Sequence, residues 1–267
     1  MIKRIIDKVS NVSFYQEAID KLQNRVDFLS NRQKDLITEL YQFYSNEVLN
    51  DLSEIDSKKQ VLFNQLLGTS IGEAFYILNA ISQTKQIEGD ICEFGVAQGS
   101  TSALMANEIS NTNKKIWLFD SFEGLPKPSQ GDELIHDIFN LGSMGAYHGQ
   151  MSNKRELVEA KLNAIDFPEN RIEIVPGFIE QTILAKHLPK KVSFAYVDFD
   201  FYEPIKIALE YLDKCMDSGA VVVVDDYQFF SSGVEKAVQE FLESRESNYE
   251  FTLPIQTAGK FCLLRKL

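Results

Sequence analysis

The chain has 267 residues, a net charge of −12 and 44% hydrophobic residues. This length suits one α/β domain with an appendage, or two small domains, and the composition can supply a full core. The negative charge argues against nucleic acid as the main partner. No apolar run approaches the ~20 residues that a membrane helix needs. Asp7 and Lys8 interrupt the apolar segment that a signal peptide would require. We therefore expect no membrane insertion.

The cysteines give a second indication of compartment. Cys92, Cys215 and Cys262 are far apart in the sequence and form no CxxC pair. Such spacing provides neither a disulfide framework nor a zinc site, and it favours a reducing cytoplasmic location.

Residues 1–60 contain neither proline nor glycine and have a helical pattern. Their apolar residues recur every seven positions on two lines that lie three residues apart, as in the a and d positions of a heptad. The a line holds Val12, Ile19, Val26 and Leu40, and the d line holds Tyr15, Leu22, Leu29, Leu36 and Phe43. Gln33 interrupts the a line. β-Branched residues at a with leucine at d favour a parallel two-stranded coiled coil.

The alternative is a long helix that packs on its own domain. We predict residues 1–60 to be a helical extension, with coiled-coil oligomerisation into a homodimer or larger assembly as one possibility. Residues 61–267 then form the second domain. Its first part, residues 61–88, continues a helical pattern punctuated by Gly68 and Gly72, and a helix there could cover the sheet or the cofactor cleft.

From Gly89 onward, short apolar segments alternate with helical ones. This alternation predicts an α/β fold, a Rossmann-like parallel sheet covered by helices on both faces. The expected strands are 91–94, 116–119, 172–175, 192–197 and 220–224, and the expected helices are 100–108, 153–165, 203–215 and 233–245. A terminal hairpin around Phe251 and Phe261 should close the sheet. Residues 121–150 form a long loop with a brief helical pattern at 133–139, and such a loop is typically a lid or binding loop.

The segment Gly89–Ser100 predicts a nucleotide site, because a buried strand leads through a glycine turn into a helix. Gly95 and Gly99 allow positive φ and close approach of a ligand. Ala97 replaces the middle glycine of the dinucleotide fingerprint, which disfavours a nucleotide-dependent oxidoreductase. Glu93 precedes Gly95 by two positions, and its carboxylate suits a ligand with an ammonium group or hydroxyls. A tight turn without any ligand is the alternative.

Acidic residues follow most of the expected strands. Ligands of open α/β sheets bind at the carboxyl ends of the strands, where Asp120 could accept both hydroxyls of a ribose. Asp198, Asp225 and Asp226 could approach one another and hold a hard divalent cation, with Mg²⁺ the simplest choice. Ordinary turn and capping roles are the alternatives. Asp200 could support that group or cap the following helix.

The histidines offer a possible base. His136 and His148 lie in the long loop, where an imidazole could take a proton at neutral pH. His187 is better explained as the surface end of a helix. Among the histidines, His148 is the catalytic candidate.

Five motifs together resemble one family. They are Gly-Asp-Ile-Cys-Glu-Phe-Gly-Val-Ala-Gln-Gly-Ser (89–100), Phe-Asp-Ser-Phe-Glu-Gly-Leu-Pro (119–126), Val-Asp-Phe-Asp-Phe-Tyr-Glu (197–203), Asp-Asp-Tyr (225–227) and Gly-Val-Glu-Lys-Ala-Val (233–238). From Gly89 to Phe261 the chain resembles the macrocin O-methyltransferases, class I S-adenosylmethionine (SAM) enzymes that methylate sugar hydroxyls of macrolides and aminocoumarins.

The resemblance implies a role for each motif residue. The cofactor SAM would be held at its amino-acid end by Glu93, Gly95, Gly99 and Ser100, at its ribose by Asp120 and Ser121, and at its adenine by Gly177 and Phe178. Asp198, Asp225 and Asp226 match the Mg²⁺ ligands of the family, and Asp198 also matches its general base.

Phe199 and Pro204-Ile205 depart from the family pattern, which places the identity of the acceptor in question. The resulting expectation is a SAM- and Mg²⁺-dependent O-methyltransferase of a sugar or a glycosylated small molecule. Two alternatives remain: an N-methyltransferase of an amino sugar, and a non-catalytic coiled-coil assembly module with a vestigial SAM fold.

Overall fold

The structure is a computed structural model that describes residues 2–245 and 248–267, with side chains described from residue 19 onward. The helices are α1 (Ile2–Glu47), α2 (Ser57–Asn64), α3 (Ile71–Gln83), α4 (Ser100–Glu108), α5 (Arg155–Ala164), α6 (Ile179–Thr182), α7 (Tyr202–Cys215) and α8 (Ser232–Glu243). The strands are β1 (Asp90–Phe94), β2 (Ile116–Asp120), β3 (Ile172–Pro176), β4 (Val192–Val197), β5 (Met216–Val224), β6 (Tyr249–Thr252) and β7 (Cys262–Lys266). Short 3₁₀ turns occur at Met144–Tyr147 and Glu169–Arg171.

The strands form one seven-stranded sheet in the order β3-β2-β1-β4-β5-β7-β6. Strands β1 to β5 pair in parallel, and β7 runs antiparallel between β5 and β6. The order reverses between β1 and β4, so the carboxyl ends of these central strands flank the switch point where open α/β sheets bind ligands. The predicted fold class and terminal hairpin are confirmed.

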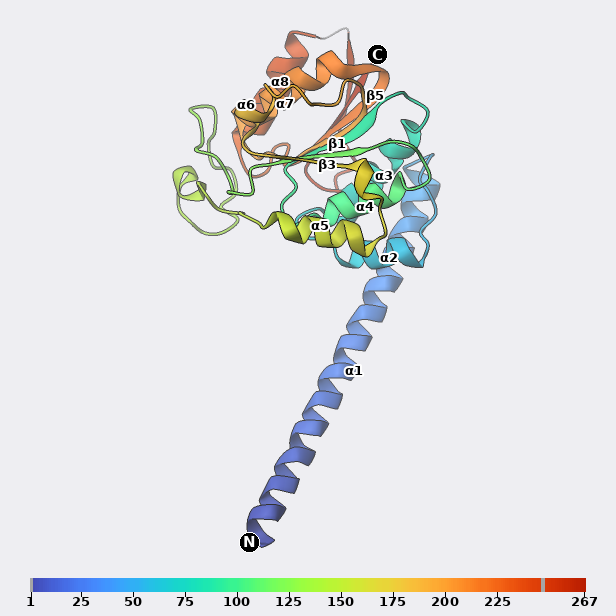
Figure 1. Ribbon diagram of the computed structural model, residues 1–267, viewed down its shortest axis with the longest axis vertical. Coiled ribbons are helices and arrows are strands. Elements are labelled where there is room, and N and C mark those ends of the chain that lie inside the picture. The colour runs from blue at the N-terminus through green and yellow to red at the C-terminus, as the bar shows by residue number, and fades with distance from the viewer. Residues whose placement is uncertain (1, 246–247) are drawn as a thin grey trace.

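Helices cover both faces of the sheet, as expected for buried parallel strands. Figure 1 shows α3, α4 and α5 on one side and α6, α7 and α8 on the other. Because side chains alternate along a strand, Ile91 packs in the cluster under α3 and α4, whereas Cys92 packs in the cluster under α7 and α8. The three cysteines are free thiols and all are buried.

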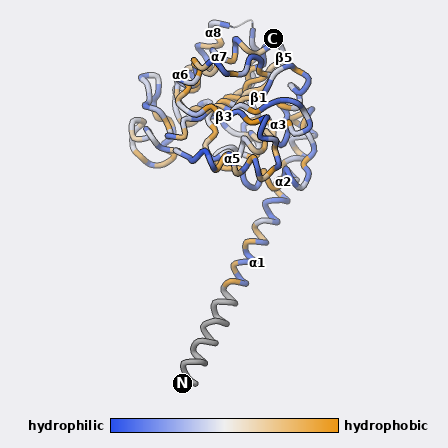
Figure 2. The backbone as a smooth tube through the Cα atoms, viewed as in Figure 1, coloured by the Kyte–Doolittle hydropathy of each residue, from blue (hydrophilic) through white to orange (hydrophobic). Residues whose placement is uncertain are grey.

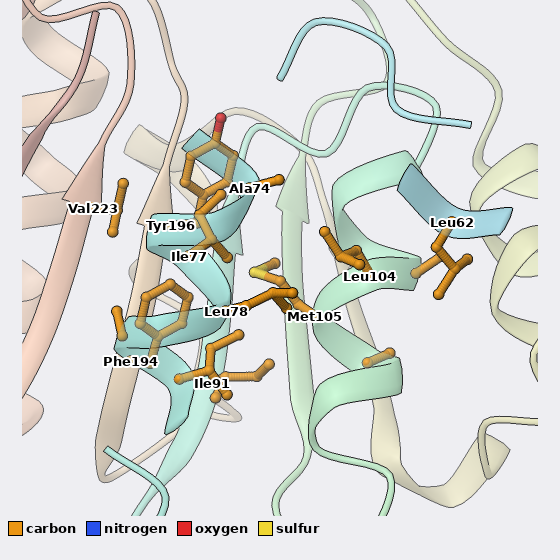
Figure 3. Packing of buried hydrophobic residues seen from close by; sticks show 14 of the residues in the cluster. Leu62, Ala74, Ile77, Leu78, Ile91, Leu104, Met105, Phe194, Tyr196 and Val223 are labelled. Atoms are coloured by element: carbon orange, nitrogen blue, oxygen red, sulfur yellow. The ribbon is translucent and has the colours of Figure 1, made fainter. Parts of the chain in front are cut away.

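The larger core joins the sheet to the helices that precede and follow β1. Figure 3 shows Ile77 and Leu78 of α3 meeting Phe194 of β4, with Leu104 and Met105 of α4 beside them. All five side chains are fully buried. This packing fixes α3 directly against the central strands, so α3 covers the sheet as its sequence pattern suggested.

The helices of the amino-terminal region have different bounds from those that the sequence pattern predicted. The helical pattern predicted over 61–88 is two helices, α2 and α3, separated by a break in which Gly68 has a φ of +90°. Gly72 lies inside α3, where a Cβ would overlap Ala258 and the hydroxyl of Tyr44. The boundary proposed at residue 60 falls within α2. Most of α1 projects away from the body of the molecule (Figure 1).

The long loop has no helix over 133–139, contrary to the sequence pattern. Leu134 instead forms a bridge with Ser231, and the Ile135 N–H donates to the Phe230 carbonyl. Asp132 is buried and accepts hydrogen bonds from the Tyr202 backbone N–H (2.8 Å) and the Ser231 hydroxyl (3.0 Å). The loop is therefore tied to the amino-terminal ends of α7 and α8, and these contacts override its local helical tendency.

Strand β5 begins at Met216, four residues before the start expected from the apolar run at Ala220. No helix in the described part of the chain is long and apolar enough to cross a membrane.

Candidate active site

A cavity of about 540 Å³ opens at the carboxyl ends of the five parallel strands. One lining residue follows or ends each strand: Gly95, Asp120, Gly177, Asp198 and Asp225. This volume lies within the usual range for small-molecule sites, and its place at the switch point is the expected one for an open α/β sheet.

The turn after β1 requires glycine at Gly95. Its φ is +89°, and a Cβ there would overlap the backbone carbonyl oxygen of Asp198 at the end of β4. The following Ala97 also has a positive φ, +48°. The backbone N–H groups of Val96 and Ala97 donate to Oδ2 of Asp120 at 2.7 and 2.9 Å. The carboxylate at the end of β2 thus holds the turn in this conformation.

Asp120 and Ser121 both line the cavity, and the ribose contacts inferred for them stay predictions. Oδ1 of Asp120 accepts from the Phe122 backbone N–H at 2.6 Å. The Ser121 hydroxyl donates to the Gly124 carbonyl at 3.0 Å. A carboxylate has about four acceptor positions, so Asp120 can organise the turn and still accept from a ligand hydroxyl.

Gly177 and Phe178 also line the cavity. The Gly177 N–H donates to the Asp120 carbonyl at 2.9 Å, and its φ is +126°. Any side chain at this position would be strained, so the turn after β3 also needs a glycine.

Three other predicted cofactor contacts lie outside the cavity lining. Glu93 is 1% exposed and accepts a hydrogen bond from Ser102 of α4. Burial raises the pKa of Glu93 well above its usual range. Ser100 accepts from Nζ of Lys161 at 2.5 Å. A Cβ on Gly99 would approach Cα of Val158 to 3.0 Å. Glu93 and Gly99 are packed against helices α4 and α5, and the cofactor contacts inferred for Glu93, Gly99 and Ser100 stay predictions.

The opposite side of the cavity is acidic. Asp198, Asp200, Asp225 and Asp226 all line it. Burial, followed by the charge of Asp225, raises the pKa of Asp198 well above its usual range. Burial also raises the pKa of Asp200 to about 7 and that of Asp226 to about 10. The strand ends thus bring Asp198, Asp225 and Asp226 to the same cavity, and the metal-binding role assigned to them stays a prediction.

Glu73 is a fifth member of this acidic group, and the motif analysis missed it. It comes from α3 and is 3% exposed. The Tyr196 hydroxyl donates to Oδ2 of Asp225 at 2.7 Å and lies 3.3 Å from Oε1 of Glu73. Burial, then the charge of Asp225, raises the pKa of Glu73 well above its usual range. The sequence did contain one indication of this role, because Glu73 lies within the apolar segment that forms α3, where charged residues are uncommon unless they have a partner.

The donor chemistry suits a hard divalent cation, because several oxygen ligands meet without an intervening basic side chain. Within the part of the chain that the structure describes, no three histidine, cysteine or acidic side chains converge as metal ligands. Oδ2 of Asp225 accepts from the Tyr196 hydroxyl and Oδ1 accepts from the Asp226 N–H, which leaves each oxygen a further acceptor position but fixes the orientation of the carboxylate. Metal binding by Asp198, Asp225 and Asp226 would therefore require these side chains to reorient.

His148 is exposed and does not line the cavity. Its Nδ1 lies 3.2 Å from the Leu125 carbonyl. The preceding Tyr147 is fully buried and donates to Asp137 at 2.6 Å, so it supports the loop from within. The ring of His136 lies tilted by 45° against that of Phe229, with ring centroids 5.0 Å apart. The geometry gives His148 no contact with the cavity, and its catalytic role stays a prediction.

Apolar side chains complete the cavity wall. Ile138 and Phe139 come from the long loop, and Phe199 and Phe229 come from the segments after β4 and β5. Among the described residues that line the cavity, none is lysine, arginine or histidine. The cavity thus combines an apolar wall with an acidic floor and offers no side-chain cation to a phosphate.

The sheet order and the position of the cavity define a class I methyltransferase fold. The structure resembles the O-methyltransferase NovP, with a TM-score of 0.61 and 20% identity over 73% of this chain and 80% of that one. It also resembles CalS11, a calicheamicin methyltransferase, with a TM-score of 0.59 and 23% identity over 88% of this chain and 91% of that one. These similarities establish the fold.

The chain belongs to the macrocin-O-methyltransferase (TylF) family, whose profile matches residues 75–262. A curated relative from Streptomyces olivaceus is 8-demethyl-8-(2,3-dimethoxy-α-L-rhamnosyl)-tetracenomycin-C 4′-O-methyltransferase. It is 26% identical over 144 residues, which span 53% of this chain and 54% of the relative. The match therefore spans about half the length of that protein.

The acidic group makes a prediction about stability. Replacing Glu73 with Gln removes one buried ionisable group beside Asp225, and the amide can donate a hydrogen bond to that carboxylate. We expect Glu73→Gln to stabilise the ligand-free protein by about 1 kcal/mol, because unpaired buried charge is unfavourable. Thermal unfolding at neutral pH measures the change. The matched control is Glu210→Gln on the exposed side of α7, which should leave the melting temperature unchanged. A melting temperature lowered by Glu73→Gln would contradict the prediction.

Proposed function

We propose that this protein transfers a methyl group from SAM to a hydroxyl of a sugar or glycoside. The observation that carries the proposal is the cavity at the strand ends, where a glycine turn held by Asp120 faces a group of partly or fully buried carboxyl groups. Membership of the family gives the reaction class. When bound, SAM would supply a methyl group on a positively charged sulfonium.

The cofactor would lie on the side of the cavity formed by β1, β2 and β3. Asp120 would accept from the ribose hydroxyls while it retains the backbone of the glycine turn, and Ser121 would lie beside it. Gly95 would allow the cofactor to approach the backbone. Gly177 and Phe178 would lie against the adenine. Glu93, Gly99 and Ser100 would shape the end that receives the amino acid. A sulfonium and an ammonium group are electrostatically suited to a cavity lined by acids and by no basic side chain.

The acceptor would lie on the side formed by β4, β5 and the long loop. Asp198 is the proposed base for the acceptor hydroxyl. Its raised pKa makes it a stronger base than an ordinary carboxylate when it is ionised. Because the methyl group would pass directly from the sulfonium sulfur to the acceptor oxygen, the principal contributions of the protein would be positioning and charge complementarity. The loop wall at Ile138 and Phe139 would exclude water from the reacting groups.

Asp198→Asn tests the assignment of roles. We expect at least a ~10³-fold fall in turnover, because the amide cannot accept the hydroxyl proton. Affinity for S-adenosylhomocysteine should change by less than about threefold, which corresponds to less than 1 kcal/mol. Calorimetric titration measures binding, and methyl transfer to a panel of glycosides measures turnover. Asp35→Asn on exposed α1 is the matched control. Equal loss of binding and turnover would contradict the assignment.

We further propose that the reaction depends on Mg²⁺. Asp198, Asp225 and Asp226 would hold Mg²⁺ through carboxylate oxygens, as in the family pattern. The ion would lower the pKa of the acceptor hydroxyl and orient its oxygen. The raised pKa values of Asp198 and Asp226, caused by burial and mutual repulsion, support a bound cation.

Mg²⁺ should therefore raise the melting temperature of the ligand-free protein in a saturable manner. Asp225→Asn should weaken this response at least tenfold in Mg²⁺ concentration, whereas Asp217→Asn, on the exposed start of β5, should leave it unchanged. EDTA should also abolish methyl transfer. Full activity in EDTA would contradict the Mg²⁺ role, and it would instead agree with N-methylation of an amino sugar.

The acceptor is proposed to be an uncharged glycoside. The curated relative is named for a rhamnosyl tetracenomycin, whereas CalS11 is described as a TDP-rhamnose 3′-O-methyltransferase. Without a lining lysine, arginine or histidine, the cavity here would leave a diphosphate close to carboxylates.

We expect neutral rhamnosides with an aromatic aglycone to be methylated with kcat/KM at least ~10²-fold above TDP-rhamnose. This ratio corresponds to about 3 kcal/mol of transition-state discrimination. Competition between the two acceptors with labelled SAM measures the ratio directly. A preference for the nucleotide sugar would contradict the neutral-acceptor proposal and leave the O-methyltransferase assignment intact.

A further inference from the structure

Helix α1 has two apolar faces, and the site described above uses neither. The first face meets the body of the protein near the carboxyl end of the helix. Ile37 is fully buried and Tyr44 is 2% exposed. The ring centroid of Tyr44 lies 5.1 Å from that of Phe75 on α3. In the heptad of the sequence, Ile37 and Tyr44 are e positions. The body of the protein therefore binds the e line of α1.

The second face is the a and d line, which is exposed except at Leu40, a partly buried a residue that packs against the core. The exposed fractions on the d line are 67% for Leu22, 52% for Leu29, 47% for Leu36 and 46% for Phe43. Ile19 and Val26 on the a line are 56% and 58% exposed. In Figure 2, apolar positions recur along the part of the projecting helix that is coloured by hydropathy. Val12 and Tyr15 lie outside the described side chains. We call the a and d residues from Ile19 to Phe43 the α1 seam.

We propose that two copies of this chain pair through the α1 seam as a parallel, in-register, two-stranded coiled coil. The repeat itself specifies the kind of partner. A strict seven-residue spacing is matched by another helix with the same spacing, whereas a globular surface imposes no such period. A second copy carries the same repeat over the same length.

The area of the seam is adequate for such an interface. From Ile19 to Phe43 it extends for about 36 Å along the helix. Pairing two copies would remove on the order of 1,000 Å² of surface from water, close to the lower limit for specific protein interfaces. The e line stays on the body during pairing, so the proposed contact does not compete with the packing of Ile37 and Tyr44.

Charge placement favours the parallel orientation. Arg25 and Arg32 occupy g positions. In an antiparallel pair, the g residues of one helix lie beside the g residues of the other, so arginine side chains would approach each other in several registers. In a parallel pair g residues flank e residues, and Arg25 would face uncharged Ser30. Gln33 is exposed at an a position, where in register it would meet its own counterpart. A single polar a residue specifies register in this way.

The test of association compares two neighbouring substitutions in the full chain. Leu29 and Phe28 are 52% and 54% exposed, but Leu29 lies on the seam and Phe28 lies at a c position. The wild-type protein and Phe28→Lys should be dimers by sedimentation equilibrium at micromolar concentration. Leu29→Lys should raise the dimer dissociation constant at least ~10²-fold. Circular dichroism and binding of S-adenosylhomocysteine verify that each variant is folded.

The test of orientation uses a thiol placed on the seam. Gln33→Cys should form a disulfide-linked dimer under mild oxidation, because in-register a positions face each other. Asn31→Cys, at the outward f position, should not. The native cysteines are buried, so the introduced thiol is the accessible one. A monomeric wild type, a larger oligomer, equal loss of association in Phe28→Lys, or cross-linking through Asn31→Cys alone would each overturn the proposal. None of these outcomes bears on methyl transfer.

Discussion

The carboxylate of Asp120 controls the geometry on which the rest of the site depends. It ends β2 but accepts hydrogen bonds from Val96 and Ala97 in the turn after β1. Gly95 in that turn has no room for a Cβ because the end of β4 lies against it. Three strand ends are thus fixed to one another by one carboxylate and one glycine. A cavity placed there has little freedom to change shape, which suits a reaction that depends on positioning.

Burial of like charges is the second constraint. Glu73 is buried beside the partly buried Asp198 and Asp225, and loss of hydration in this group raises the pKa of each above its ordinary value. Such a group lowers the stability of the ligand-free protein, since ionised carboxylates lose hydration without gaining a cation. Proteins retain arrangements of this kind where function requires them. The same argument explains why both a cationic cofactor and a divalent ion are physically reasonable occupants of this cavity.

Local patterns predicted the sheet well and the loop poorly. Each parallel strand is a continuous apolar segment with β-branched or aromatic residues, and such segments have few alternatives once they are buried. Residues 133–139 have a helical pattern of their own, yet Asp132 and the bridge at Leu134 hold them in another conformation. These partners come from residues 202 and 231, so a local reading of the sequence could not include them.

Local sequence position also explains which site residues could be predicted and which one was missed. Asp120, Asp198 and Asp225 follow strands, so the topology of a parallel sheet is enough to bring them to one edge. Glu73 reaches the group from a helix that precedes the sheet, and its partner Tyr196 lies on a central strand.

Helix α1 carries apolar side chains on two neighbouring faces. The e line contributes Ile37 and Tyr44 to the core, and the adjacent d line keeps Leu36 and Phe43 exposed beside them. If α1 only packed on the body of its own chain, one apolar stripe would be enough. That stripe would also have no reason to continue to Ile19, far beyond the last contact of α1 with α3. The continuation of the repeat along the projecting segment is therefore better explained by a second helix than by the fold of one chain.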